Sequence, residues 1–179
     1  MGAAAAGKGD VGLRVIGIDP GIATCGYGVI EGSGSARRPA VLTWGALRPE
    51  GEGAERLRVL RAGIAVLLAE HRPEAAAVER LFHTRNVRTA AAVGQARGVV
   101  LLACAEAGLE VAEYTPTELK LAVAGYGGAD KRQVRHMVAA QLGLVRIPSP
   151  DDAADALGLC LCHLAGAGLR RAVGAGERP

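Results

Sequence analysis

Two acidic residues of this sequence stand at the ends of apolar runs that are typical of buried strands. Asp19 ends the run RVIGID, and a Pro-Gly pair then turns the chain. Glu79 ends a second short run, EAAAVE. Residues just beyond the carboxyl ends of parallel strands gather in one crevice of an open sheet. We therefore expect Asp19 and Glu79 to be neighbours.

The stretch SPDDAADALGL, residues 149–159, supplies further acids. On a helix, Asp152 and Asp155 lie on one face about 5–6 Å apart, because they are three residues apart. Ser149 suits the N-cap of this helix and Pro150 suits its first position. Asp155 also interrupts an otherwise apolar helix face. This face can close the crevice between the strand ends.

Each acid also has a structural explanation when it is taken alone. Asp19 suits a turn in which it bonds its own backbone, and Glu79 suits an ion pair with a nearby arginine. Asp151 and Asp152 fall in the first turn of a helix, where carboxylates contribute about 0.3–1 kcal/mol through capping contacts and the helix dipole. Only convergence of the acids separates the two interpretations.

Convergence of four carboxylates has a definite electrostatic consequence. At ~4 Å spacing and an effective dielectric near 20, each pair repels by ~4 kcal/mol, so a cation must sit among them. Ligation by carboxylates alone, with no nearby histidine or thiolate, favours Mg²⁺ or Mn²⁺ over zinc. Two such ions roughly 4 Å apart are used for in-line attack on a phosphodiester. The four acids therefore predict an enzyme that acts on phosphodiester bonds.

The apolar pattern predicts an α/β fold. Three strands come first, at Leu13–Ile18, Cys25–Glu31 and Ala40–Leu47, followed by a helix at Ala54–His71. The second half has predicted strands at 74–79 and 109–114, and helices at 86–107, 117–124, 131–142 and 150 to about 170. Two strands joined by a helical crossover form a parallel pair. We expect a five-stranded mixed sheet, three antiparallel strands and then parallel strands, flanked by helices.

Length and composition predict one domain with short tails. The domain is expected at residues 13–170, with flexible tails at 1–12 and 171–179. The formal net charge of +3 permits a nucleic-acid partner without requiring one. Four cysteines without CxxC units predict buried reduced thiols and a cytoplasmic protein. The longest apolar stretch, Val99–Ala105, is too short to span a membrane.

Five short motifs occur in a fixed order along residues 14–169. They are GIDPG at 17–21, AVER at 77–80, GQARG at 94–98, YTPTELKLAVAGYGGADKRQVRHMV at 114–138 and DDAADALGL at 151–159. This set closely resembles the RuvC Holliday junction resolvases, or crossover junction endodeoxyribonucleases. The resemblance implies a ribonuclease H-like fold and a homodimer that resolves four-way DNA junctions by paired symmetric nicks in homologous recombination and DNA repair. It also implies the RuvA and RuvB branch-migration complex as a partner.

The same resemblance assigns the acids. Four of them match the acidic positions that hold the divalent ions and carry catalysis: Asp19, Glu79, Asp152 and Asp155. We expect two Mg²⁺ ions per subunit, with Mn²⁺ able to substitute. The position of Asp152 is histidine in some relatives. The extra acid, Asp151, has no obvious counterpart, and it points about 100° away from Asp152 on a helix, so it is interpreted as a capping residue.

The resemblance also implies a DNA-binding loop after the second acid. Phe82 matches an aromatic position that presses against bases at the junction centre, and stacking on an unpaired base contributes ~1–3 kcal/mol. Core packing under the loop is the alternative for this side chain. Arg80 and Arg85 make the loop basic and are predicted to bind DNA, although a solvated run of charges has the same composition.

Further cations are predicted to follow the DNA backbone. Lys120 and Lys131 match basic positions that contact it near the cleavage site, and each starts or follows a turn that leaves it exposed. Arg132 is predicted to extend this surface, and Arg135 is a further candidate. Both arginines are equally explained as ordinary exposed charges on a helix.

Three other functions use some of the same features. A ribonuclease H-like nuclease acting on RNA-containing substrates has the same metal site, and only the family match of Phe82 and the two lysines favours the junction. A non-catalytic junction-binding module is expected to lack one or more acids, and none is missing here. A phosphotransferase of the actin and sugar-kinase type needs a second lobe that this length does not supply.

Overall fold

The computed structural model describes residues 12–33, 38–80 and 87–176. Its strands are β1 (Leu13–Asp19), β2 (Cys25–Gly32), β3 (Ala40–Leu47), β4 (Ala75–Glu79) and β5 (Glu110–Tyr114). Its helices are α1 (Gly53–His71), α2 (Val87–Glu106), α3 (Pro116–Ala124), α4 (Lys131–Leu142) and α5 (Asp151–Gly176). Every predicted element is present in this part of the chain. One prediction was wrong at its end, because α5 continues beyond residue 170 to Gly176.

The strands form one mixed sheet in the order β3-β2-β1-β4-β5. β1 pairs antiparallel with β2, and β2 pairs antiparallel with β3. β1 and β4 run parallel, as do β4 and β5. The predicted sheet of three antiparallel strands followed by parallel strands is therefore confirmed. Ile18 lies beside Val78 in the β1–β4 register, so Asp19 and Glu79, the last residues of β1 and β4, stand side by side at the same end of the sheet.

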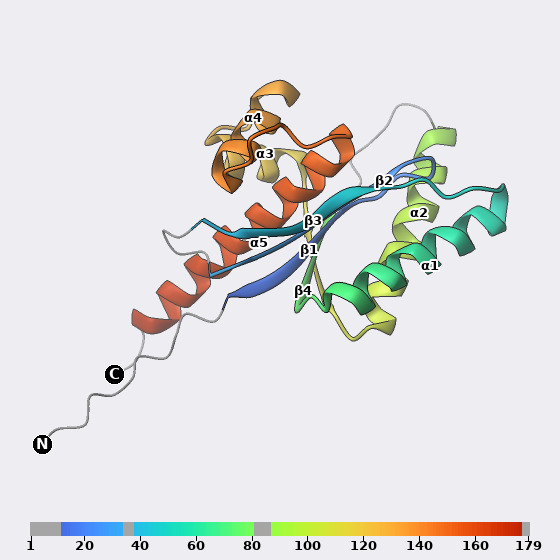
Figure 1. Ribbon diagram of the computed structural model, residues 1–179, viewed down its shortest axis with the longest axis horizontal. Helices are drawn as coiled ribbons and strands as arrows, with labels where there is room; N and C mark the ends of the chain where they lie inside the picture. Colours follow the sequence, from blue (N-terminus) through green and yellow to red (C-terminus); the bar gives the residue numbers. More distant parts are fainter. Residues whose placement is uncertain (1–11, 34–37, 81–86, 177–179) are drawn as a thin grey trace, which may run out of the picture.

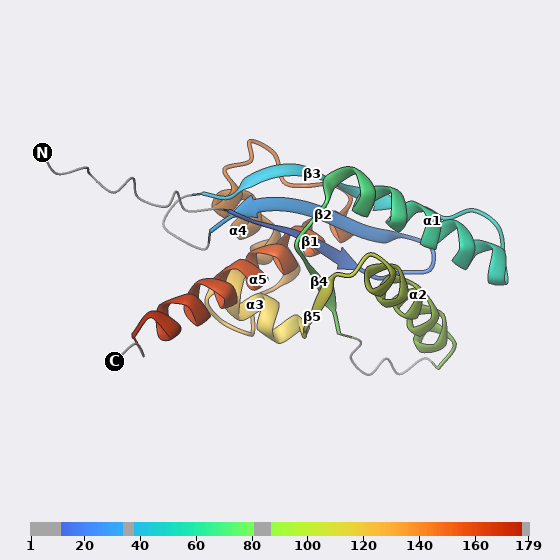
Figure 2. The same ribbon diagram turned by 90° about the horizontal axis from the view of Figure 1, so that it is seen from below.

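Helices cover both faces of the sheet. α3, α4 and α5 gather on one face, and α1 and α2 cover the other, as Figures 1 and 2 show from two directions. The side chains of β1 alternate accordingly, because successive residues of a strand point to opposite faces. Val15 belongs to a core with Leu157 of α5, whereas Ile16 belongs to a core with Leu60 and Ile64 of α1.

Glycines let α5 lie directly on the sheet. A Cβ added at Gly17 would overlap the main-chain carbonyl of Ala156, and one added at Gly26 would overlap that of Asp152. A Cβ at Gly28 would lie 2.7 Å from the Leu157 side chain. The close approach brings the first turns of α5 to the strand ends.

The start of α5 differs from the sequence prediction. The helix begins at Asp151, after a cis peptide bond between Ser149 and Pro150. The carbonyl of Pro150 accepts the Ala153 N–H at 3.0 Å. Ser149 is thus not the N-cap, and Pro150 precedes the helix instead of occupying its first position. The backbone around the proline, which the sequence pattern does not reveal, decides this difference.

Two other predictions concern cysteines and membranes. The four cysteines are free and buried, as predicted. Cys160 Sγ contacts the carbonyls of Val15 at 3.6 Å and Gly28 at 3.4 Å, while His163 Nδ1 lies 3.0 Å from the hydroxyl of Tyr114. Both contacts join α5 to strands of the sheet. Among the helices that the structure describes, none has the length and apolar character needed to cross a membrane.

The glycine contact with α5 is testable. Gly17→Ala should lower the free energy of unfolding by about 3 kcal/mol, because the added methyl group meets a main-chain carbonyl that cannot move freely. Gly98→Ala on α2 is the matched control, since its Cβ would meet no other described residue within 4 Å. That change should be neutral or raise stability by about 0.5–1 kcal/mol. Urea unfolding measures both, and equal effects would contradict the assigned contact.

Candidate active site

Three of the four predicted acids line one cleft. Asp19 at the end of β1, Glu79 at the end of β4 and Asp155 in the second turn of α5 border a cavity of about 250 Å³. Lys120 and Lys131 border the same cavity. The acids come from three elements that are far apart in the sequence. The structure therefore brings three of the four predicted acids together, whereas Asp152 does not border the cavity.

Asp19 and Glu79 meet inside the cleft. Burial first, and then the charge of Glu79, raise the pKa of Asp19 to about 8. The two side chains share a hydrogen bond that favours the protonated form of Asp19 and the charged form of Glu79. Burial nevertheless raises the pKa of Glu79 above its ordinary value. A proton between the two carboxyl groups thus reduces their repulsion.

The α5 acids have different environments. Burial raises the pKa of Asp155, and the ammonium group of Lys131 opposes that shift from 3.6 Å away. Asp152 is half-buried and does not border the cavity, but its charge contributes to the raised pKa values of Asp19 and Asp155. Its main chain lies over Gly26. Asp152 is therefore within electrostatic reach of the cleft, at its margin.

The carboxylates of the cleft are suitable ligands for a hard divalent cation. In this structure they interact with one another and with Lys131. Among the described residues, no three carboxylate, thiol or imidazole groups are close enough together to hold a metal ion as they stand. The proton on Asp19 and the Lys131 ammonium group supply the positive charge in this arrangement. Oxygen donors that lack compensating charge suit Mg²⁺ or Mn²⁺. Binding such a cation requires Asp19 to lose its proton and Asp155 to exchange its lysine partner.

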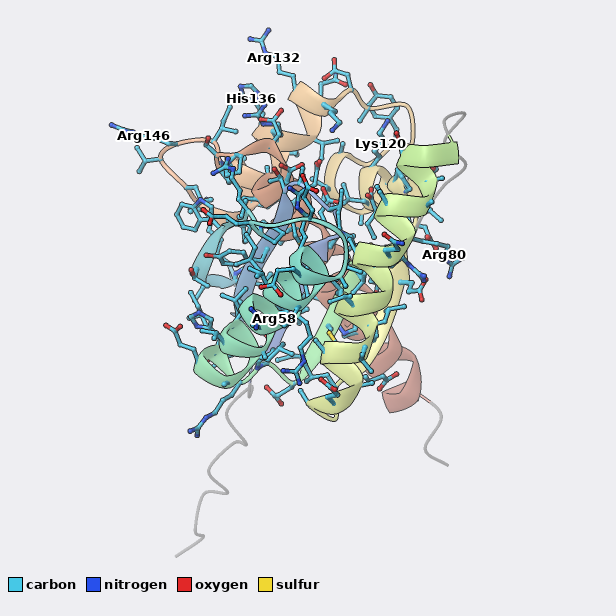
Figure 3. All side chains as sticks on the ribbon, turned by 90° about the vertical axis from the view of Figure 1, so that its right-hand side faces the viewer. Arg58, Arg80, Lys120, Arg132, His136 and Arg146 are labelled. Carbon is cyan, nitrogen blue, oxygen red and sulfur yellow. The ribbon has the colours of Figure 1, made fainter. Side chains whose placement is uncertain are left out.

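The predicted DNA-binding cations divide between two recesses. Lys120 and Lys131 border the acid cleft, whereas Arg132 borders a separate groove on α4. Figure 3 shows Lys120 and Arg132 at the same end of the molecule. Both lysines are thus placed to contact a phosphate beside the acids, while Arg132 lies next to that position.

The loop after Glu79 is only partly described. Phe82 and Arg85 lie outside the described residues, so their predicted DNA contacts stay predictions. Arg80 is described: its Nε lies 3.7 Å from Oε2 of Glu113, which also accepts a hydrogen bond from Arg97 of α2. Glu113 therefore connects the residue after the second acid to α2, and this contact explains the arginine of the GQARG motif.

An ion pair that the sequence did not predict anchors the start of α5. Arg135 of α4 contacts Asp151 with a distance of 2.7 Å from Nη1 to Oδ1. The Arg135 side chain is only 28% exposed, and its Nε is buried with no hydrogen-bond partner among the described residues. Arg135 therefore holds two helices of the fold together, and its guanidinium group is not free to extend the surface predicted to bind DNA. Asp151 has more than a capping role, because it ties the acid-bearing helix to α4.

Comparison with known proteins agrees with this geometry. The family model described as crossover junction endodeoxyribonuclease RuvC matches residues 15–163. The chain belongs to the RuvC family. The matched range includes every element from β1 to the middle of α5, and with them all four acids.

Individual RuvC proteins are similar over most of their length. The RuvC of Chloroflexus aggregans is 53% identical over 154 residues, which are 84% of this chain and 92% of the relative. That of Rubrobacter xylanophilus is 51% identical over 165 residues, 91% of each chain. A structure of Thermus thermophilus RuvC in complex with a Holliday junction substrate has a TM-score of 0.83 at 39% identity, over 88% of this chain and 96% of that one. The expected ribonuclease H-like fold is confirmed.

In the absence of bound metal, this member of the RuvC family should become less stable as the pH rises. Asp19 keeps its proton up to about pH 8 in the folded protein but loses it near pH 3.8 in the unfolded chain. The stability that this proton contributes is fully present below pH 3.8 and is lost as the pH rises to about 8. Asp19→Asn should flatten this dependence. Thermal unfolding in a chelator across the interval measures the slope. Glu55→Gln on α1 is the control and should keep it, and a rising wild-type curve would contradict the assignment.

Replacement of Asp151 by asparagine should affect the protein differently from the same replacement of Asp155. Asp151→Asn should lower the free energy of unfolding by up to about 1 kcal/mol, because its ion pair is partly exposed. DNA cleavage should stay within about threefold, since only the orientation of α5 is affected. Asp155→Asn should reduce cleavage by at least about 100-fold, because even outer partners of metal ligands contribute up to that amount. Equal losses of cleavage would place Asp151 among the ligands.

Proposed function

We propose that this chain is a divalent-metal-dependent endodeoxyribonuclease that resolves four-way DNA junctions by paired symmetric nicks, in homologous recombination and DNA repair. The observation that carries the proposal is the cleft in which Asp19, Glu79 and Asp155 meet beside Lys120 and Lys131. Acids with raised pKa values next to cationic side chains suit a reaction at a phosphate. The family to which the chain belongs supplies the substrate, because its members are named for cutting crossover junctions.

The four acids are proposed as the catalytic metal ligands. Asp19, Glu79, Asp152 and Asp155 would hold two Mg²⁺ ions per subunit, with Mn²⁺ able to substitute. When bound, such ions activate water and stabilise the leaving oxygen of an in-line displacement. The oxygen-only donor set and the raised pKa values of Asp19, Glu79 and Asp155 support this assignment, because both mark a cluster that lacks positive charge.

The chain's own cations have a separate task. Lys131 pairs with Asp155 across 3.6 Å, yet 78% of its side chain is exposed, so its ammonium group can turn toward a phosphate at the cleft mouth. Lys120 lies on another wall of the same cavity. Together they can hold the DNA backbone in place while leaving its bases unread, because contacts to phosphates position a nucleic acid without specifying sequence. Arg80, Phe82, Arg85 and Arg132 are proposed as further DNA contacts.

A homodimer suits this reaction. The two scissile phosphates of a four-way junction are related by a two-fold axis, which a C2 dimer can engage together. The exposed Leu102 of α2, which has 54% of its surface open, is a residue that such an interface could cover. The proposed setting is the cytoplasm, with the RuvA and RuvB branch-migration complex as the partner that delivers the junction.

Cleavage of a synthetic mobile four-way junction tests the function. In Mg²⁺, the wild-type chain should produce paired nicks at symmetric positions, and Asp19→Asn should lose at least about 100-fold in rate, because a ligand at the most buried point is removed. Glu55→Gln on α1, a matched change from an acid to an amide, should cleave at the wild-type rate. Products are resolved by strand-specific end labels on all four arms.

The substrate comparison decides between the alternatives. A plain duplex and an RNA–DNA hybrid of the same sequence should be cut far more slowly than the junction. Preference for the hybrid would indicate a nuclease for RNA-containing substrates. Tight junction binding without cleavage in either Mg²⁺ or Mn²⁺ would indicate a binding module. Undiminished nicking by Asp19→Asn would remove the assigned site.

A further inference from the structure

A second recess lies on α4, beside the acid cleft and separate from it. Its volume is about 570 Å³, compared with about 250 Å³ for the cleft. The lining used below comes from the α3–α4 turn and the outer side of α4: Tyr126, Asp130, Arg132, Gln133, His136 and Met137. None of these residues borders the acid cleft. We call this recess the α4 groove.

The side chains of the α4 groove are held in place before any ligand binds. The Tyr126 hydroxyl donates to Oε1 of Gln133 at 2.9 Å, and the Asp130 N–H donates to the same oxygen at 3.0 Å. The Gln133 N–H donates in turn to Oδ1 of Asp130 at 2.7 Å. This network fixes the edge of the tyrosine ring, while half of the residue remains exposed. It also gives the carboxylate of Asp130 a hydrogen-bond donor, the Gln133 N–H.

The groove combines an apolar platform with cations. Tyr126 of the α3–α4 turn and Met137 of α4 are 50% and 40% exposed, which leaves a large apolar surface beside a polar helix. His136 bonds the Arg132 carbonyl through Nδ1 at 2.7 Å, which sets its ring along the helix. Arg132 makes no ion pair within the described part of the chain. In Figure 3 its side chain projects away from the molecule, with His136 below it.

The groove and the acid cleft lie on either side of the first turn of α4. Lys131 and Arg132 are consecutive residues of α4, so their side chains diverge by about 100° around the helix axis. Lys131 borders the cleft and Arg132 borders the groove. Figure 3 shows Lys120, Arg132, His136 and Arg146 spread over one end of the molecule. A DNA strand whose phosphate lies at the cleft can therefore cross the first turn of α4 and enter the groove.

We propose that the α4 groove binds a DNA arm of the junction next to the scissile phosphate. Tyr126 and Met137 pack against a sugar or base face, and Arg132 contacts a backbone phosphate. Aromatic rings receive nucleic-acid bases whatever their sequence, and arginine contacts to phosphate are equally independent of sequence. The inference rests on the proposed function, because it names where that substrate continues beyond the cleft. An acidic protein segment is the rival occupant.

Binding and cleavage of a four-way junction by the full chain test the groove. Tyr126→Ala should weaken junction binding about tenfold, by removing the stacking platform. Arg132→Ala should lower the slope of log affinity against log salt by about one, because one phosphate contact is lost.

Two matched variants control the experiment. Tyr126→Phe keeps the ring but loses the bond to Gln133, and it should bind within about threefold of wild type. Arg58→Ala removes an exposed arginine of α1, far from the groove in Figure 3, and should leave the salt slope unchanged. Thermal unfolding identifies any variant that fails to fold, and the exposed Arg132 provides a test that does not depend on Tyr126.

The possible results separate the two proposals. If wild-type protein cuts the junction while Tyr126→Ala and Arg132→Ala bind it with wild-type affinity and salt slope, the groove proposal is wrong and the function stands. The groove would then be open to a protein partner. If wild-type protein neither binds nor cuts the junction, the proposed function itself fails. Equal losses in affinity for Arg58→Ala and Arg132→Ala would also overturn the groove, because a general charge effect would explain them.

Discussion

The close contact between α5 and the sheet is the constraint on which the active site depends. Gly17 and Gly26 carry no side chain at the points where the helix backbone crosses β1 and β2. A helix separated by ordinary side chains packs about 10 Å from its neighbour, and the acids of α5 would then stand away from the strand ends. The missing Cβ atoms bring Asp152 and Asp155 into electrostatic reach of Asp19, which a rigid central strand holds in place.

This assembly concentrates negative charge in a partly buried place, and the fold must compensate for it. Asp19 keeps a proton, and Lys131 provides a permanent positive charge next to Asp155. The surrounding core, in which Ile18 and Val78 are fully buried, holds the acids together despite their repulsion. Stability and function therefore oppose each other at this edge of the sheet, as expected where a site is prepared for a cation.

Much of the fold follows from local patterns, whereas the contacts between elements do not. The apolar run of β3 predicted both of its ends, and two acids at parallel strand ends predicted their meeting. The end of α5 was missed because its last turns hold Ala, Leu and Arg, which favour a helix, beside glycines that cost only about 1 kcal/mol each. The Arg135–Asp151 pair joins different helices, and no periodicity relates such partners.

The capping box at the start of α4 has a consequence for specificity. Asp130 and Gln133 fix which residue begins the helix, and therefore the angle at which each later side chain leaves it. That angle assigns Lys131 to the acid cleft and Arg132 to the groove. A helix begun one residue later would bring Arg132 to the place of Lys131, with a flat guanidinium group among the acids instead of a compact ammonium group. The cap thus determines which cation faces the acid cleft and which faces the groove.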